Sequence, residues 1–319
     1  MSSYEKHFNK GYLIIITAAI IYLIFLLLSN SQILITTVEK VRWGFLVLIF
    51  VSEFTVLIFR TIRNRIFLKS IDINISFSRI FLIYFAGLSM SVTPANIGEL
   101  IRTQFLKREV GRSIASTAPI YFGERINDLI AITAITCFFL IFVNFLEGEI
   151  VVAISALIIL FGIAILKSHL LFRFFKSKIK SIKFLEKHTE NFDQFYNNMQ
   201  NMLKIDVTKK TIPASFPIWL THGISAYLAF LAFGVNFGFM KVYVIYFTSL
   251  IIGASSFIPG GIGITETSLL GLLTIQGINF SIAVALTLFL RLLTIWFAVI
   301  VGIVASKILL HKDPPTRSD

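Results

Sequence analysis

Apolar residues occur along this chain in long runs that polar residues seldom interrupt. Six runs are long enough to cross a membrane as helices, because a bilayer core needs roughly 17–25 apolar residues. They cover about residues 11–29, 43–59, 114–143, 150–166, 212–233 and 281–309. Two shorter runs, at about 78–92 and 242–257, lead into breaks that contain proline and glycine. The pattern predicts an all-α polytopic membrane protein.

The two breaks share the pattern Pro-x-x-Ile-Gly, and each is followed by a lone arginine inside a later apolar run. Arg125 lies 31 residues after the first proline, and Arg291 lies 32 residues after the second. Gly111 and Gly277 each precede their arginine by fourteen residues. The residues expected to shape the breaks are Pro94, Gly98, Pro259, Gly260, Gly261 and Gly263. This recurrence predicts a duplicated unit with broken helices, a feature of transport proteins.

Each break and the short segment after it, 97–106 or 263–276, is expected to form a hairpin that enters the bilayer and returns to the same side. Proline ends a helix by removing a donor, and glycine permits the turn. Irregular backbone at membrane depth requires protein or a water-filled cavity around it. We therefore expect about six full transmembrane helices plus two re-entrant hairpins, or eight helices if the hairpin arms are included.

The charge distribution favours one orientation. Residues are 56% hydrophobic and only 14% charged, with a net charge of +12, and the mean hydropathy is +0.84. With the N-terminus in the cytoplasm and both hairpins re-entrant, 24 of the 29 Lys and Arg residues fall on the cytoplasmic side. This count predicts a multi-pass protein of the cell membrane with both termini cytoplasmic, and hairpins that enter from opposite faces as an inverted repeat. Topology and anionic lipid then explain the positive charge, and nucleic acid is not expected as a partner.

Seven ionisable residues interrupt or border the apolar runs, where charge is costly. They are Glu53, Glu99, Glu124, Arg125, Asp128, Glu266 and Arg291. Arg125 lies eleven residues after position 114 and Arg291 eleven residues after position 280, about 16 Å along a helix in each case, and the two helices are expected to start from opposite sides. A guanidinium binds phosphate through two parallel hydrogen bonds. We therefore predict that Arg125, Arg291, Glu266, Glu99, Glu124 and Asp128 form a central site for an anionic head group. The alternative is that these charges only neutralise one another.

Other chemistry is not indicated. The sequence contains no cluster with metal-ligand spacing, no Walker A or dinucleotide-binding motif and no nucleophile elbow, so neither a metal, a cofactor nor an enzyme is expected. His222 is interpreted as a packing histidine. The basic segment at about 167–210 is either an amphipathic helix on the inner leaflet or a simple connector. The whole chain, 1–319, is expected to be a single integral membrane domain.

Two stretches of the chain resemble the transmembrane, flippase-like region of lysylphosphatidylglycerol synthases. They read TPANIGELIRTQFLKREVG…APIYFGERINDLIAI and IPGGIGITETSLLGLLTIQGI…AVALTLFLRLLTIWFAVIVG. The resemblance covers about 11–310 and includes stand-alone, uncharacterised members. It implies a membrane region that moves a modified phospholipid, while a separate domain attaches the amino acid. The sequence ends at Asp319, soon after the last apolar run, so aminoacyl transfer is not expected. Some relatives are linked to polyprenyl-phosphate carriers, which also have anionic head groups.

Three functions follow from these observations. The first is a lipid flippase or transporter for a phospholipid or polyprenyl-phosphate-linked lipid with an anionic head group. The second is an integral-membrane transferase that acts on lipid phosphates, with Glu124, Asp128 or Glu266 as the acid or base. The third is a non-transporting partner of a separate lipid-modifying enzyme, with 167–210 as the docking surface. The oligomeric state is left open.

Overall fold

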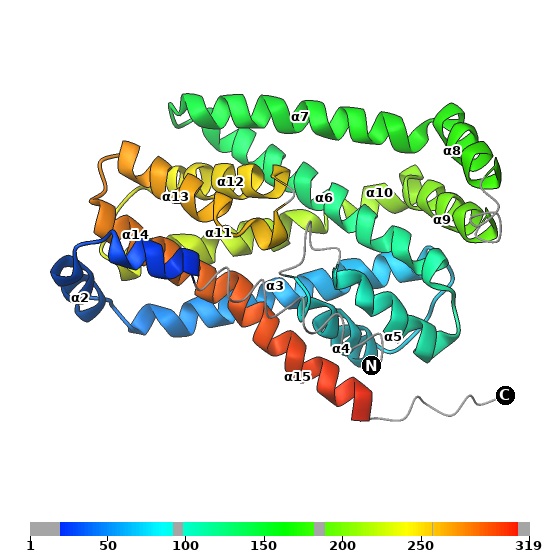
Figure 1. Ribbon diagram of the computed structural model, residues 1–319, viewed down its shortest axis with the longest axis horizontal. Helices are drawn as coiled ribbons and strands as arrows, with labels where there is room; N and C mark the ends of the chain where they lie inside the picture. Colours follow the sequence, from blue (N-terminus) through cyan, green and yellow to red (C-terminus); the bar gives the residue numbers. More distant parts are fainter. Residues whose placement is uncertain (1–19, 92–97, 182–188, 257, 312–319) are drawn as a thin grey trace.

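The computed structural model describes residues 20–91, 98–181, 189–256 and 258–311, and these ranges form helices and turns without a strand (Figure 1). The elements after a first helix, Ile20–Leu27, are α2 (Ser31–Glu39), α3 (Gly44–Lys69), α4 (Phe77–Leu88), α5 (Ile101–Val110), α6 (Ile114–Leu140), α7 (Leu146–Lys167), α8 (His169–Ser181), α9 (Thr189–Met202), α10 (Ile205–Thr211), α11 (Ser215–Ala232), α12 (Phe239–Ser255), the 3-10 turn η3 (Pro259–Gly261), α13 (Ile264–Ile275), α14 (Phe280–Arg291), the π-helical segment η4 (Leu292–Trp296) and α15 (Phe297–His311). The all-α polytopic prediction is confirmed. Pro94 lies outside the described residues.

Four helices within these ranges are long and apolar enough to cross a membrane. They are Gly44–Lys69, Leu146–Lys167, Ile205–Ala232 and Phe280–His311. Helix α6 has 27 residues, a length of about 40 Å, but carries three charges near its middle. The described part of the first apolar run is the helix Ile20–Leu27, which ends near the expected boundary and meets α2 at an angle of 103°. Helix α3 also continues ten residues beyond the expected end of its apolar run at 59.

Two helical hairpins lie toward opposite ends of the long helices. Helices α4 and α5 lie at the right of Figure 1, and α12 and α13 lie at the left. Helix α4 has 12 residues, about 18 Å, which is too short to cross a bilayer. The second break contains three glycines with left-handed backbone, at φ of 59°, 62° and 89° for Gly260, Gly261 and Gly263. Residues with a Cβ avoid this region, so the turn between α12 and α13 depends on glycine.

The matched glycine spacing has a structural explanation. Gly111 and Gly277 both follow the second arm of a hairpin in the left-handed conformation, with φ of 71° and 86°. Two residues later, the side chains of Ser113 and Asn279 accept hydrogen bonds from backbone N–H groups and cap the next helix. The helix that carries the arginine therefore starts three residues after the glycine in both copies. Equal caps fix both arginines at the same distance from a helix start.

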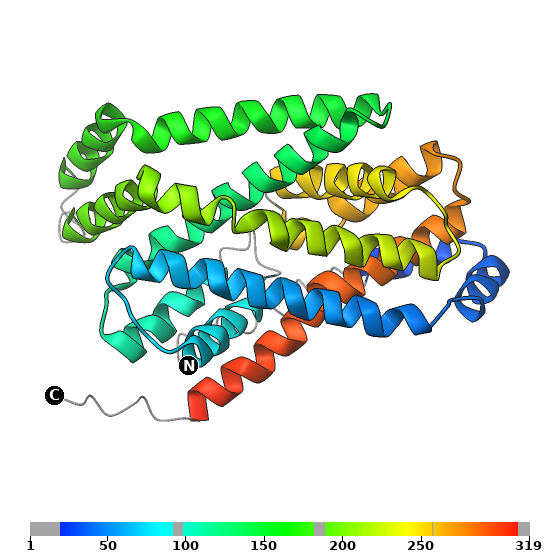
Figure 2. The ribbon, with the colours of Figure 1, turned by 180° about the vertical axis from the view of Figure 1, so that it is seen from behind.

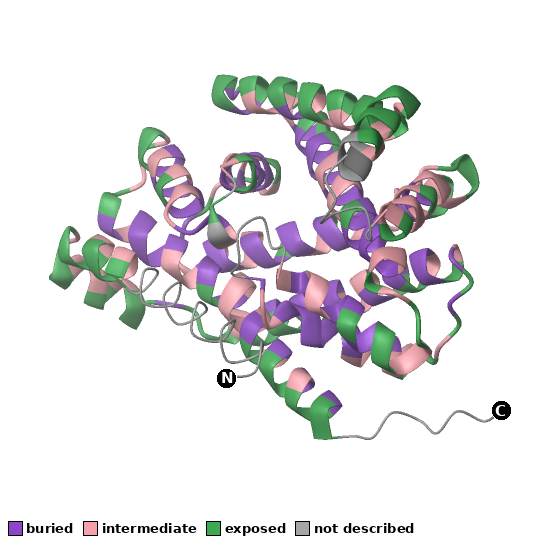
Figure 3. Ribbon diagram, turned by 45° about the vertical axis from the view of Figure 1, so that its right-hand side comes forward, coloured by how far each residue is buried: buried purple, intermediate pink, exposed green. Residues whose placement is uncertain are grey.

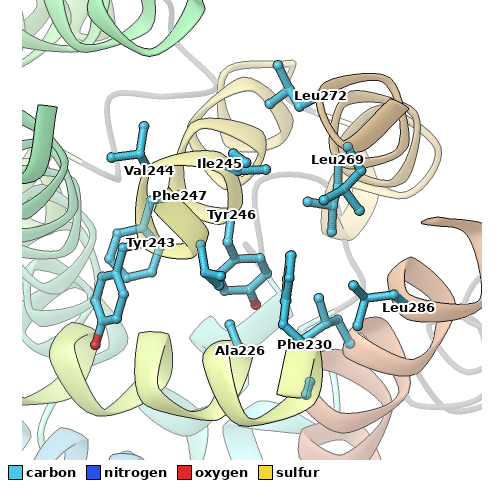
Figure 4. Packing of buried hydrophobic residues seen from close by; sticks show 14 of the residues in the cluster. Ala226, Phe230, Tyr243, Val244, Ile245, Tyr246, Phe247, Leu269, Leu272 and Leu286 are labelled. Carbon is cyan, nitrogen blue, oxygen red and sulfur yellow. The ribbon is translucent and has the colours of Figure 1, made fainter. Parts of the chain in front are cut away.

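The core lies where α11, α12, α13 and α14 meet. Figure 4 shows Tyr243, Tyr246 and Phe247 packed between α12 and α11, with Leu269 and Leu286 from the neighbouring helices. Helices α3 and α11 lie side by side along their length (Figures 1 and 2). Buried residues concentrate in the interior, whereas α7 is mostly exposed (Figure 3). Between its charged ends, the exposed side chains of α7 are apolar, as expected for a helix that faces lipid.

The basic segment folds into helices α8 and α9 followed by α10. Phe172 on α8 stacks on Tyr196 of α9, with ring centroids 3.6 Å apart, and the two helices form a hairpin. Exposed Leu170 and Phe174 lie on α8 beside basic residues. The last part of the basic segment, from Ile205, also belongs to the candidate span Ile205–Ala232.

Candidate functional site

A group of charged side chains lies buried between α3, α5, α6 and the turn before α5. We call this group the first centre; it comprises Arg63, Glu99, Arg102, Glu124, Arg125 and Asp128. Three guanidinium groups face three carboxylates, so the formal charges balance. Burying a charge is tolerated when a partner neutralises it and hydrogen bonds satisfy it. The pairing therefore explains how so many charges persist in an apolar chain.

Asp128 on α6 is held by side chains from two other helices. Its Oδ1 atom lies 2.5 Å from Nη1 of Arg63 on α3 and accepts a hydrogen bond of 2.9 Å from Nε1 of Trp219 on α11. Arg63 also donates to the Ser215 hydroxyl at 2.8 Å. Both charged side chains are almost completely buried. These contacts join α3, α6 and α11 at the level of the first centre.

Glu124 is neutralised by a different arginine. Arg102 on α5 forms an ion pair with Glu124, and Asn64 on α3 donates to the other carboxylate oxygen at 2.9 Å. The Arg102 guanidinium also lies over the rings of Tyr84 and Tyr121, at 5.2 and 5.6 Å from their centroids. Arg102 is therefore fully engaged by anionic and aromatic partners.

Arg125 differs from the other two arginines of the first centre. Its Nη2 atom lies 3.5 Å from Glu99 and 3.5 Å from Asp128, distances too long for strong hydrogen bonds. Its side chain is 28% exposed, whereas the Arg63 side chain is fully buried and that of Arg102 is 4% exposed. The Arg125 guanidinium is held in place by balanced charge and by the Tyr121 ring, at 5.4 Å.

The first centre also contains unsatisfied polar atoms. Nε of Arg125, Nε and Nη2 of Arg63, and Oδ2 of Asp128 are buried and have no hydrogen-bond partner among the described residues. Buried polar groups are normally hydrogen-bonded, and exceptions require an explanation such as a water molecule or a ligand. Three unsatisfied N–H donors and a partly exposed guanidinium make the first centre suited to an oxyanion.

A smaller second centre lies at the other hairpin. Arg291 Nε donates to Glu266 at 2.8 Å, and its Nη2 donates to the Gly260 carbonyl at 2.6 Å. The Gly263 N–H donates to the same carboxylate at 2.8 Å, and so does the hydroxyl of Tyr22, at 3.1 Å. Glu266 is completely buried and Arg291 is 3% exposed. Within the described residues, no fully buried side-chain nitrogen or oxygen atom of this pair lacks a partner.

The second centre holds the break in shape. Arg291 and Glu266 together bind the backbone at both ends of the glycine turn. Arg291 is the last residue of α14 and directly precedes the π-helical segment η4. A π segment re-aims side chains within a helix and occurs often at functional sites. Pro259, Gly260 and Gly261 form η3, so the residues that the sequence pattern selects for the second break lie together in the turn.

Comparison with known proteins places the chain in a family. The model of the lysylphosphatidylglycerol synthase TM region matches residues 13–302. The chain belongs to this family. Relatives include UPF0104 membrane proteins of Pyrococcus horikoshii, 25% identical over 92% of this chain and 95% of the relative, and of Methanocaldococcus jannaschii, 27% identical over 66% of this chain and 90% of the relative. A UPF0104 membrane protein of Methanothermobacter thermautotrophicus is 22% identical over 93% of this chain and 95% of the relative. The resemblance seen in the sequence is therefore confirmed, and membership makes a lipid-related membrane function plausible.

Two arginines of the first centre, Arg63 and Arg102, were not predicted from the sequence. Both were counted only among the basic residues of the cytoplasmic side and not among the site residues, yet the structure buries Arg63 on α3 and Arg102 on α5. The sequence of α3 did contain a pattern that could have indicated Arg63. One face of the helix carries residues at helical spacing, namely Arg60, Arg63, Asn64 and Phe67. Arg65 and Lys69 on the opposite face are exposed. The C-terminal, charged part of α3 is therefore an amphipathic stretch of helix.

Proposed function

We propose that this protein moves a lipid with an anionic head group across the membrane, and that the first centre binds the head group. The observation that carries the proposal is the state of Arg125, which is partly exposed and held at 3.5 Å by two carboxylates. A phosphate oxygen can approach within normal hydrogen-bond distance and replace these long contacts. Neighbouring donors on Arg63 lack partners and are available to the same ligand.

A phospholipid and a polyprenyl-phosphate-linked lipid share the chemistry that this site recognises, namely an oxyanion at the end of an apolar chain. Membership of the lysylphosphatidylglycerol synthase TM region family supports a lipid as the substrate. The two hairpins, one from each copy of the repeated pattern, support transport, since broken helices near a central site recur in transporters. Both classes of lipid are therefore substrates to test.

Head-group translocation in reconstituted vesicles tests the proposal. Wild-type protein, the Arg125→Ala variant or the Arg108→Gln variant is reconstituted into vesicles that contain labelled phosphatidylglycerol or a labelled polyprenyl phosphate. Arg108 is an exposed arginine on α5, so its replacement is the matched control. We expect at least a tenfold loss of rate for Arg125→Ala, because a hydrogen bond to a charged group contributes about 1.5–3 kcal/mol. Equal rates for the two folded variants would contradict the assignment.

Transfer chemistry is the second candidate function. In this structure Glu124, Asp128 and Glu266 are each paired with an arginine, which favours an electrostatic role over proton donation. Incubation of the purified protein with lipid phosphates, followed by mass spectrometry, distinguishes the two. A covalently altered lipid would support the transferase, whereas unchanged lipid that has crossed the bilayer supports transport.

A non-transporting partner of a lipid-modifying enzyme is the third candidate. The α8–α9 hairpin presents exposed apolar and basic side chains that suit either anionic lipid or a protein partner. Deletion of 169–202 is expected to leave translocation measurable if transport belongs to the helical body. If the deletion variant still translocates lipid but no longer supports the activity of a partner enzyme, the docking role is favoured instead.

A further inference from the structure

A third buried polar cluster lies between α3, α11 and α12. His222 has the Glu53 carboxylate 3.0 Å from its Nδ1 atom and the Tyr246 hydroxyl 3.2 Å from its Nε2 atom. All three residues are less than 10% exposed. Figure 4 shows Tyr246 reaching from α12 toward α11, the helix that carries His222. The sequence favoured a packing role for this histidine, but the structure places a carboxylate against it.

Charge balance separates this cluster from the two arginine centres. The first centre pairs three guanidinium groups with three carboxylates, and the second pairs one with one. Glu53, by contrast, faces an imidazole that is neutral unless it takes up a proton. A buried carboxylate without a counter-charge is costly. One proton on the Glu53–His222 pair removes that cost, and no other group within ion-pair distance among the described residues does so.

The surroundings of His222 fit its protonated form. The imidazolium ring carries two N–H donors, whereas the neutral ring carries one. An acceptor faces each nitrogen, the Glu53 carboxylate at Nδ1 and the Tyr246 oxygen at Nε2. Neither Glu53 Oε1 nor His222 Nδ1 has a hydrogen bond of good geometry among the described residues. The cluster can therefore gain or lose a proton without breaking a well-formed contact.

The other charged groups near the cluster do not replace this proton. Tyr246 lies within electrostatic reach of Glu53, Arg60 and Arg291. Arg291 is occupied by Glu266. Arg60 is two helical turns from Glu53 on α3, about 10 Å, and stacks at 5.5 Å from the centroid of the Trp219 ring.

Trp219 connects the cluster to the first centre. Its ring meets that of His222 edge to face, with centroids 5.5 Å apart, and its Nε1 atom donates to Asp128. Asp128 also contacts Arg125. An anion at Arg125 that draws the guanidinium away from Asp128 therefore acts on His222 through two intervening side chains, Asp128 and Trp219.

We propose that Glu53, His222 and Tyr246 form a proton-binding site at membrane depth, and that an anionic head group at the first centre strengthens proton binding there. The proton comes from water, binds between Glu53 Oε1 and His222 Nδ1, and returns to water after the head group leaves. Chains of acidic residues and histidine serve as proton relays in membrane transporters. Coupling between two sites is reciprocal, so the proton equally strengthens binding of the anion. The coupling rests on the proposed function, but proton binding itself does not.

A chain with His222 as its sole histidine tests the proposal without altering the site. The chain has five histidines. His169 and His311 are exposed, and His7 and His188 lie outside the described residues. The variant His7→Asn/His169→Asn/His188→Asn/His311→Asn therefore leaves the cluster intact. The ¹⁵N signals of the imidazole are recorded between about pH 5 and 8 in neutral detergent micelles, with and without phosphatidylglycerol.

At a fixed pH, we expect the protonated fraction of the His222 imidazole to be larger in micelles that contain the lipid than in micelles without it. Arg125→Ala in the same background should remove the lipid effect, and this arm controls for the surface charge of the mixed micelle. A signal that does not change with pH in either condition would overturn the proton site. A lipid effect that persists in Arg125→Ala would overturn the coupling, even if translocation itself is observed.

Discussion

In both halves of the chain, an arginine pairs with a glutamate that lies just beyond a broken helix, yet the two centres differ in how completely their atoms are satisfied. At the second centre, Arg291 and Glu266 contact each other and the glycine turn at 2.6–2.8 Å. At the first, Arg125 and Glu99 are 3.5 Å apart, and neighbouring donors lack partners. The same sequence pattern thus supports a closed structural pair in one copy and an open anion site in the other.

The strongest test of this comparison removes one partner of the closed pair. Glu266→Gln leaves Arg291 buried without a counter-charge, and we expect a destabilisation of about 3–5 kcal/mol. The loss of stability is measured by heating the protein in detergent and monitoring the folded fraction by size-exclusion chromatography. Glu147→Gln replaces an exposed glutamate at the start of α7 and should leave stability unchanged. If the Glu266 variant is as stable as this control, the second centre does not hold the break.

The second test asks which arginine needs its planar shape for activity. Arg125→Lys retains the charge but loses bidentate recognition of phosphate, so we expect a roughly tenfold slower translocation with little change in stability. Arg291→Lys should lower stability instead, because one ammonium cannot reproduce the contacts to Glu266 and Gly260. Rates normalised to folded protein separate the two outcomes. The comparison fails if both lysine variants lose rate and stability alike.

The third test compares the packing of the hairpins. A Cβ on Gly253 would lie 1.8 Å from the Thr265 hydroxyl, whereas one on Gly87 would lie no closer than 3.3 Å to its nearest neighbour, the Glu99 carbonyl. We expect Gly253→Ala to destabilise the protein by about 1–3 kcal/mol and Gly87→Ala to cost less. Adding Thr265→Ala should recover part of the loss, which a double-mutant cycle detects. Equal costs at the two glycines would show that the hairpins pack alike.

The smallest expected effect concerns the tryptophan beside the first centre. Trp219→Phe removes the hydrogen bond to Asp128 and keeps most of the ring, so we expect a change of about 0.5–1.5 kcal/mol. Affinity for phosphatidylglycerol should change more than stability, because Asp128 keeps its contact with Arg63. Trp296→Phe is the matched control, since its indole N–H donates to Tyr22 at the second centre. A change of affinity in the control alone would reverse the roles of the centres.

Much of the fold could be predicted from the sequence, because apolar runs of membrane length and repeated glycine breaks fix where helices begin and end. The caps after Gly111 and Gly277 explain why the spacing to each arginine was informative. The difference between Arg125 and Arg291 could not be predicted, since their spacing is nearly identical. It depends on long-range partners: Arg63 and Arg102 occupy the other carboxylates around Arg125, whereas a turn of backbone satisfies Arg291.

Equilibrium binding of phosphatidylglycerol, measured by native mass spectrometry, tests the central claim most directly. Wild-type protein, Arg125→Ala and Arg108→Gln are titrated with the lipid in the same detergent. The account predicts at least a tenfold weaker affinity for Arg125→Ala and no change for Arg108→Gln, because Arg125 combines a partly exposed guanidinium with an unsatisfied Nε in the first centre, whereas Arg108 lies on the exposed face of α5. Equal affinity of all three folded proteins would contradict an anion site at the first centre.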